Sequence, residues 1–178
     1  VSFAPDGERN RPLPVREIER QNFSRTDLGN GEVNRVLGGG LVRGSMILLG
    51  GEPGIGKSTL SLQIALGTSG MKTLYVSGEE SPHQIKMRAE RIGIGNDDCL
   101  IYSETDLENI LAQAARHTPD LVVIDSIQTI HTATIDSSPG SVSQIRECAA
   151  LLQKYAKQTN TSVVVIGHIT KDGNIAGP

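Results

Sequence analysis

GEPGIGKST, residues 51–59, matches the pattern G-x-x-x-x-G-K-[ST] at every defined position. It follows the apolar run at residues 46–49 and leads into a segment whose apolar residues have helical spacing. Glycines let backbone N–H groups converge on phosphate oxygens, and the next helix adds the positive end of its dipole. The stretch therefore predicts a phosphate-binding loop (P-loop) between a strand and a helix.

Two side chains of this loop have expected roles beyond the backbone. We expect Lys57 to reach the β- and γ-phosphates of ATP and the Ser58 hydroxyl to ligate Mg²⁺. The alternative is a glycine-rich turn with an incidental lysine, but the flanking strand and helix argue against it. The residues expected to bind the nucleotide are Gly51, Glu52, Pro53, Gly54, Ile55, Gly56, Lys57, Ser58 and Thr59.

Apolar runs alternate with helical patterns along the rest of the chain. The runs lie at 46–49, 73–77, 100–102, 121–124 and 162–166, and most are continuously apolar, as expected of strands covered on both faces. Helical spacing appears at 84–91, 107–115 and 145–156, with Thr105 and Glu108 predicted as a capping box. The alternation predicts an α/β fold with a mostly parallel central sheet flanked by helices.

Length and composition fit one domain. The 178 residues divide into a proline-containing, charged segment at 1–30, predicted to be a linker or lead-in, and a nucleotide-binding domain at 31–178. The beginning has no apolar core of a signal peptide, and no apolar run reaches the roughly 18 residues of a membrane span. We therefore expect a cytoplasmic protein.

Charge and cysteine content limit the classes of partner. The formal net charge is −3, so the strongly basic balance typical of a nucleic-acid-binding domain is absent, and any DNA contact must come from a local patch. Cys99 and Cys148 are the only cysteines and form no CxxC pair. We interpret them as buried thiols and not as zinc ligands.

Carboxylates follow two of the predicted strands. Asp125 ends LVVID, and a carboxylate at the carboxyl end of a buried parallel strand can hold Mg²⁺ directly or through water. Glu79 and Glu80 follow the strand at 73–77, and one of them could polarise the attacking water. We favour Glu79 because it comes first after the strand. The alternative is that both acids are solvated at the start of the next helix.

The last strand ends in His168, followed by Thr170 and Lys171. His168 or Thr170 could sense the γ-phosphate by hydrogen bonding, although a lone histidine is as often structural. Arg88 and Arg91 share a short helical segment with a lysine, and we interpret this cluster as a solvated face.

The stretches RVLGGGLVRGS, GGEPGIGKSTL, YVSGEES, VVIDSIQT and GHITKDGNIAGP closely resemble the RadA (Sms) family of bacterial DNA repair proteins. The similarity runs from Val33 to the end. The resemblance implies a RecA-like sheet in which the His168 strand lies between the P-loop strand and the Asp125 strand, with the Glu79 strand beyond. It makes Glu79 the catalytic glutamate and gives His168 the position of the γ-phosphate switch residue of RecA.

The same resemblance implies an activity. Its members couple DNA-stimulated ATP hydrolysis, with Mg²⁺, to the processing and branch migration of recombination intermediates on single-stranded or branched DNA. They work as hexameric rings with ATP at the subunit interfaces.

The chain also departs from the family pattern. The four-cysteine zinc motif is not present, and the Lys/Arg-containing motif and Lon-protease-like domain of the family would lie beyond Pro178. We therefore expect a truncated ATPase core whose arginine finger lies outside this sequence. Asn34 stands where the family commonly has aspartate, and Lys171 is the remaining candidate for a DNA contact.

Two other functions use similar loops. A small-molecule kinase would need an arginine-rich lid, and no arginine cluster of that kind follows the P-loop. A KaiC-like assembly module with slow ATP turnover and no DNA coupling has a comparable glutamate pair after a strand. The sequence alone therefore leaves the KaiC-like alternative open.

Overall fold

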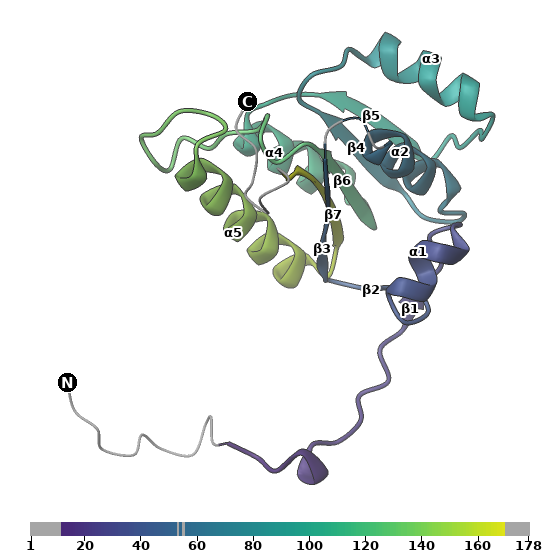
Figure 1. Cartoon of the computed structure of the whole chain (residues 1–178), viewed down its shortest axis with the longest axis vertical. Helices are drawn as coiled ribbons and strands as arrows, with labels where there is room; N and C mark the ends of the chain where they lie inside the picture. Colours follow the sequence, from purple (N-terminus) through teal and green to yellow (C-terminus); the bar gives the residue numbers. More distant parts are fainter. Residues whose placement is uncertain (1–11, 53, 55, 170–178) are drawn as a thin grey trace.

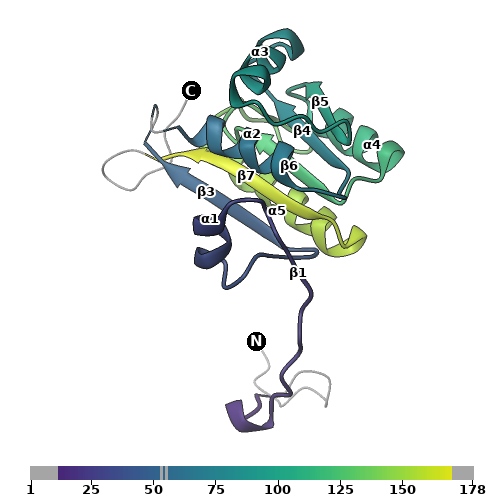
Figure 2. The same cartoon turned by 90° about the vertical axis from the view of Figure 1, so that its right-hand side faces the viewer.

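The centre of the molecule is a five-stranded parallel sheet with strand order β3-β7-β6-β4-β5 (Figures 1 and 2). It is seen in a computed structural model that describes residues 12–52, 54 and 56–169. The five predicted strands and the α/β class are confirmed, and the strand order is the one that the resemblance implied. The strands are β3 (Met46–Gly51), β4 (Thr73–Ser77), β5 (Cys99–Ser103), β6 (Leu121–Asp125) and β7 (Ser162–His168).

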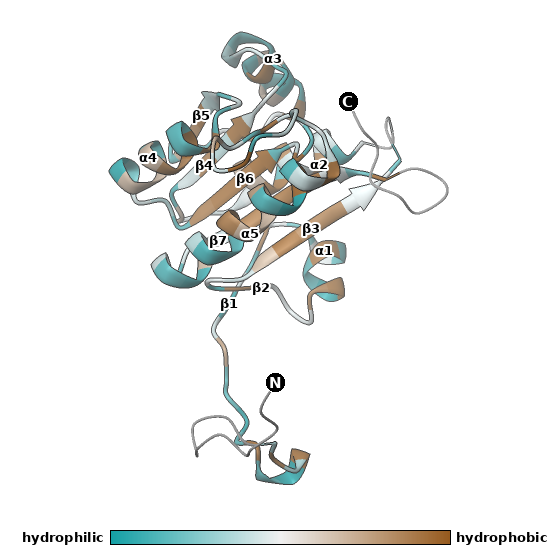
Figure 3. Cartoon of the chain, turned by 90° about the vertical axis from the view of Figure 1, so that its left-hand side faces the viewer, coloured by the Kyte–Doolittle hydropathy of each residue, from teal (hydrophilic) through white to brown (hydrophobic). Residues whose placement is uncertain are grey.

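Helices cover both faces of this sheet. One layer contains α2 (Lys57–Gly67) and α3 (Pro82–Ile92), and the other contains α4 (Leu107–His117) and α5 (Val142–Thr159) (Figure 1). The sheet itself is apolar, whereas polar residues colour much of the outer helix surface (Figure 3). The pattern matches a sheet buried on both faces, as the continuous apolar runs predicted.

Each face of the sheet has its own apolar core, because successive strand residues point to opposite sides. On β6, Leu121 and Val123 belong to the core under α2 and α3. Val122 and Ile124 belong to the core under α4 and α5. The side of the sheet on which any strand residue lies is therefore known from its position in the alternation.

The chain before β3 forms a small unit packed against the domain. β1 (Arg25–Thr26) pairs antiparallel with β2 (Leu41–Val42), and α1 (Gly31–Val36) lies between them. Leu28 is fully buried, and the Asn34 side chain accepts a hydrogen bond from its N–H at 3.0 Å. The packed structure thus includes the last residues of the segment that we expected to be a lead-in.

Farther upstream, η1 (Val15–Glu17) is a single 3₁₀ turn that buries no residue. It lies on an extended arm well away from the sheet (Figure 2). Among the residues that the structure describes, no helix is both long and apolar enough to cross a lipid bilayer.

The predicted helices are present, but one predicted cap is wrong. α4 begins after Asp106, whose carboxylate accepts the backbone N–H three residues later at 3.0 Å. The expected capping box of Thr105 and Glu108 does not form, since Asp106, a better N-cap than threonine, starts the helix one residue farther on. A capping box does form at the start of α3, between Ser81 and Gln84.

Candidate functional site

All five parallel strands end at one edge of the sheet, where the P-loop follows β3. The register places Gly51 of β3 beside His168 of β7, and Asp125 of β6 beside Ser77 of β4. Asp125 lies on the same face as Val123, the face covered by α2, because alternate strand residues share a face. By the same alternation His168 lies on this face, so the structure brings Asp125 and His168 to the face that the P-loop helix covers.

The lysine of the P-loop is bonded to the first residues of its own loop. Gly54 and Gly56 adopt φ values of +84° and +87°, a left-handed conformation that favours glycine. The Lys57 ammonium group donates hydrogen bonds to the carbonyls of Gly51, at 2.7 Å, and Glu52, at 2.5 Å. Lys57 is 7% exposed, and burial lowers its pKa although the Asp125 and Glu52 carboxylates oppose this.

The helix that follows the P-loop begins at this lysine. α2 begins directly after Gly56, so its first N–H groups face the loop. Ser58 is half-buried and Thr59 is exposed at the start of this helix. Pro53 and Ile55, two of the expected nucleotide-binding residues, lie outside the described residues.

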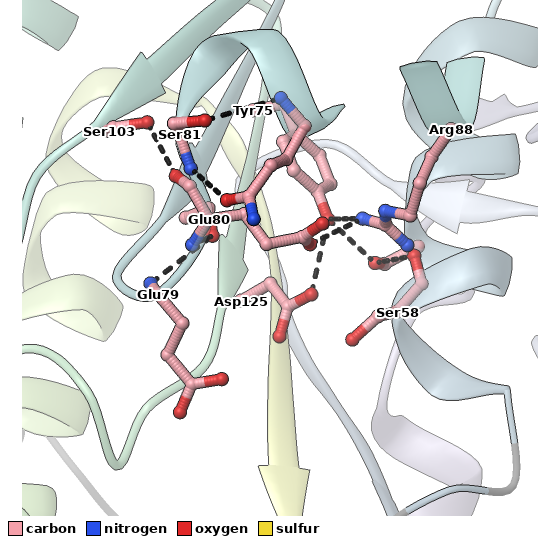
Figure 4. A network of polar contacts seen from close by, with 11 residues as sticks. Ser58, Tyr75, Glu79, Glu80, Ser81, Arg88, Ser103 and Asp125 are labelled. Atoms are coloured by element: carbon pink, nitrogen blue, oxygen red, sulfur yellow. Dashed lines mark hydrogen bonds and ion pairs between the residues drawn. The ribbon is translucent and has the colours of Figure 1, made fainter. Parts of the chain in front are cut away.

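Asp125 is held by a buried tyrosine. Asp125 is 8% exposed, and its Oδ2 atom accepts a hydrogen bond from the Tyr75 hydroxyl at 3.1 Å (Figure 4). Tyr75 lies two residues before the end of β4, on the α2 face. Burial first, and the charge of Asp125 second, raise the pKa of Tyr75 above its usual value, so the hydroxyl stays a donor.

The two glutamates after β4 have different environments. Glu80 forms an ion pair with Arg88, with 2.9 Å between its Oε1 and the Nη2 of the arginine. Glu79 is exposed, and its carboxylate has no hydrogen-bond or ion-pair partner within residues 12–52, 54 and 56–169. Figure 4 shows its side chain turned away from the Glu80 pair. Of these two glutamates, Glu79 is the one whose carboxylate is uncommitted in the described part of the chain.

His168 is fixed through its backbone. Its carbonyl accepts a hydrogen bond from the Gln128 side chain at 2.9 Å, and Gln128 is only 3% exposed. The Nδ1 atom of His168 is buried without a partner among the described residues, as is the Oε1 atom of Gln128. Thr170 and Lys171, the other candidates in this segment, lie outside the described residues.

Sequence reasoning missed three residues of this site. Arg88 was predicted to lie on a solvated face, but it is half-buried and pairs with Glu80, so that prediction is wrong. Tyr75 and Gln128 were not singled out at all. Tyr75 lies two residues before a strand end, on the same face as the expected metal ligand. This position was a signal from which a contact with Asp125 could have been predicted.

The donor set suits magnesium better than a metal that needs an all-protein cage. No group of three or more His, Cys, Asp or Glu side chains comes together in the described part of the chain. Mg²⁺ needs no such group, because it binds one or two protein oxygens plus phosphates and water. The Ser58 hydroxyl and the Asp125 carboxylate are oxygens of this kind.

Comparison with known proteins identifies the family. The family model described as AAA domain matches residues 14–174, nearly the whole chain. The chain belongs to the AAA domain family. Its P-loop is thus that of an ATP-hydrolysing enzyme, as predicted.

Curated relatives of this AAA domain are similar over almost its full length. It is 51% identical to the DNA repair protein RadA of Bacillus subtilis over 94% of the chain, and 49% identical to that of Streptococcus pneumoniae over 97%. The resemblance noted from the motifs is confirmed. The chain spans 37% and 41% of the length of these two relatives.

A solved structure supports the fold. A KaiC-like protein from Pyrococcus horikoshii superposes with a TM-score of 0.71 at 19% identity, over 86% of this AAA domain and 74% of that chain. At this identity the likeness concerns the fold alone, which is RecA-like.

Gly78, directly after β4, lies where the AAA domain has no room for a side chain. A Cβ atom there would overlap the Oγ1 and Cβ atoms of Thr129. Thr129 holds the turn after Asp125, donating to the Ser126 carbonyl at 2.9 Å and accepting from the Ser126 N–H at 3.1 Å. We expect Gly78→Ala to lower the free energy of unfolding by about 1–3 kcal/mol through overpacking.

Chemical denaturation measures this effect directly. Gly95→Ala is the matched control, because a Cβ atom at Gly95 meets nothing within 4 Å. Equal stability of the two variants would show that the Gly78 contact carries no cost.

Proposed function

We propose that this AAA domain is the DNA-dependent ATPase core of a DNA repair and recombination protein. The observation that carries the proposal is that the P-loop, Asp125 and an uncommitted Glu79 lie at one edge of the sheet. The chain is also about half identical to proteins named DNA repair protein RadA. Hydrolysis would drive the processing or branch migration of recombination intermediates.

The P-loop would bind the phosphates of ATP. Lys57 would exchange its bonds to the Gly51 and Glu52 carbonyls for bonds to phosphate oxygens, since it is already inside the loop. Bound Mg²⁺ would neutralise charge that develops on the phosphates. The Ser58 hydroxyl and the Asp125 carboxylate would hold it.

Glu79 would act on the attacking water. Its free carboxylate would accept a hydrogen bond from the water and take up its proton, which is the role of a general base. His168 lies beside Gly51 and has a buried ring nitrogen without a described partner, so it would hydrogen-bond the γ-phosphate and report its presence to the chain that follows.

The partners proposed are ATP, single-stranded or branched DNA, and further copies of the chain in a hexameric ring, in the cytoplasm. Lys171 is proposed as one DNA contact. The domain boundaries proposed are a lead-in at 1–30, whose last residues pack against the domain, and the ATPase domain at 31–178.

Steady-state ATP hydrolysis with and without single-stranded DNA tests the proposal. The measurement is made on this chain and on a version that continues past Pro178. We expect DNA to raise the rate in the longer version. Tight ATP binding without a DNA response in either would contradict DNA coupling and favour a nucleotide-driven assembly module.

A further inference from the structure

A chain of polar contacts runs from α3 to the Asp125 carboxylate (Figure 4). Glu80 pairs with Arg88 at 2.9 Å, Arg88 donates to the Tyr75 hydroxyl at 3.2 Å, and that hydroxyl contacts Asp125 at 3.1 Å. The Arg88 and Glu80 side chains are 19% and 28% exposed, so water screens their pairing only in part. The chain of contacts thus joins the glutamate next to Glu79 with the expected metal ligand.

The direction of every hydrogen bond in this chain is determined. Arg88 can only donate, so the Tyr75 oxygen accepts and must give its own proton to another group. Ser61 could also accept this proton, because its own hydroxyl proton goes to the Ser58 carbonyl at 2.9 Å, but it lies 3.5 Å from the Tyr75 oxygen. The Asp125 Oδ2 atom, at 3.1 Å, is the closer acceptor. Tyr75 is therefore a donor to Asp125.

One oxygen of Asp125 is occupied by this bond and the other is not. Among the described residues, Tyr75 supplies the only side-chain donor to the Asp125 carboxylate, and it bonds Oδ2. A carboxylate held through one oxygen keeps a fixed orientation, which directs Oδ1 in a defined way. An outer hydrogen bond of this kind typically orients a metal ligand and tunes its affinity for the metal.

We propose that Tyr75 and Arg88 are positioning residues for the metal-binding carboxylate. Arg88 is fixed by Glu80, it fixes and polarises the Tyr75 hydroxyl, and Tyr75 orients Asp125. The inference rests on the proposed function, because it takes Asp125 as a Mg²⁺ ligand. It also gives Glu80 a structural role, which leaves Glu79 for the attacking water.

Tyr75→Phe tests the inference, since it removes one oxygen and keeps the buried ring. Binding of a fluorescent ATP analogue is measured in EDTA and then across a Mg²⁺ titration, which needs no hydrolysis. We expect the affinity for the analogue in EDTA to stay unchanged. The Mg²⁺ concentration that gives half of the Mg²⁺-dependent increase in affinity should rise about tenfold, as for the loss of one charge-assisted hydrogen bond. If Tyr75 had only a structural role, the affinity in EDTA would fall as well, or the Mg²⁺ concentration would not change.

Tyr102→Phe is the matched control. Tyr102 lies on the neighbouring strand β5, and its hydroxyl bonds Glu104 at 3.3 Å, outside the chain of contacts. We expect its Mg²⁺ titration to match that of the unmodified protein. Thermal unfolding of each variant shows whether the domain is folded.

Arg88→Met tests the hydrogen bond from Arg88 to the Tyr75 hydroxyl. We expect the Mg²⁺ concentration at half of the increase in affinity to rise about threefold. This rise is smaller than that of Tyr75→Phe because Arg88 acts on Asp125 through Tyr75. In the Tyr75→Phe background the added Arg88→Met change should have little further effect, since residues of one network are not additive. Arg91→Met, an exposed arginine one turn farther along the same helix that bonds only the Met87 carbonyl among the described residues, is the control.

Asp125→Asn separates this inference from the proposed function. Asparagine still accepts the Tyr75 proton but binds Mg²⁺ poorly, so we expect a large shift in the Mg²⁺ titration. If Asp125→Asn shifts the titration and Tyr75→Phe does not, the positioning role is wrong while the metal site remains. If Asp125→Asn has no effect, the metal assignment itself is wrong, and the inference is overturned with it.

Discussion

Lys57→Ala should weaken ATP binding about a hundredfold or more. The Lys57 ammonium group is already inside the loop, where it is bonded to the Gly51 and Glu52 carbonyls. Binding the phosphates of ATP therefore does not require a further charge to be buried. Two charge-assisted hydrogen bonds of about 1.5–3 kcal/mol each give a loss of this size. Equilibrium binding of a fluorescent ATP analogue in the presence of Mg²⁺ measures it.

Lys86→Ala is the matched control for this variant. Lys86 is an exposed lysine on α3, away from the P-loop, so its removal changes the net charge equally without touching the site. We expect its ATP affinity to stay within about twofold of the unmodified protein, as for other exposed charges. An affinity of Lys57→Ala in that same range would show that the lysine keeps its carbonyl partners when ATP is bound.

The sheet was predictable because its signals are local. Five apolar runs, each bounded by turn or helix patterns, gave the strands, and the glycines and Lys57 of the P-loop gave the first crossover. The strand order needed the resemblance to known proteins, because continuous apolar runs do not distinguish one parallel neighbour from another. Adjacent strands in the sheet, such as β3 and β7, are far apart in the sequence.

Caps and lateral contacts were harder to predict for a different reason. Thr105 and Asp106 are both good N-caps, and the sequence does not show which one the tertiary structure uses. Arg88 looked like a surface residue because its partners, Glu80 and the Tyr75 hydroxyl, depend on how α3 packs on the sheet. Side-chain pairing across elements is set by packing distances that no single segment encodes.

The choice between Glu79 and Glu80 illustrates the same limit. The sequence placed both acids after β4 and favoured Glu79 only by its position. The ion pair of Glu80 with Arg88 adds a physical reason, because a carboxylate oxygen that already binds an arginine is not free to bind the attacking water. The preference for Glu79 stays a prediction, and it has a direct test.

Glu79→Gln should retain ATP binding and lose turnover. The amide has the same shape but cannot accept a proton from the attacking water, and loss of a general base costs about 10²–10⁴-fold in rate. The exposed Glu79 carboxylate has no ion-pair partner in the described chain, so we expect the thermal unfolding temperature to stay the same. Phosphate release at saturating ATP gives the rate, and binding of a fluorescent ATP analogue gives the affinity.

Glu80→Gln is the isosteric control one residue away. It weakens the pair with Arg88, so we expect lower stability and a turnover reduced by less than about tenfold, since the general base would be intact. The two variants thus separate a chemical role from a supporting one at adjacent positions. A turnover retained in Glu79→Gln and lost in Glu80→Gln would transfer the role of the base to Glu80.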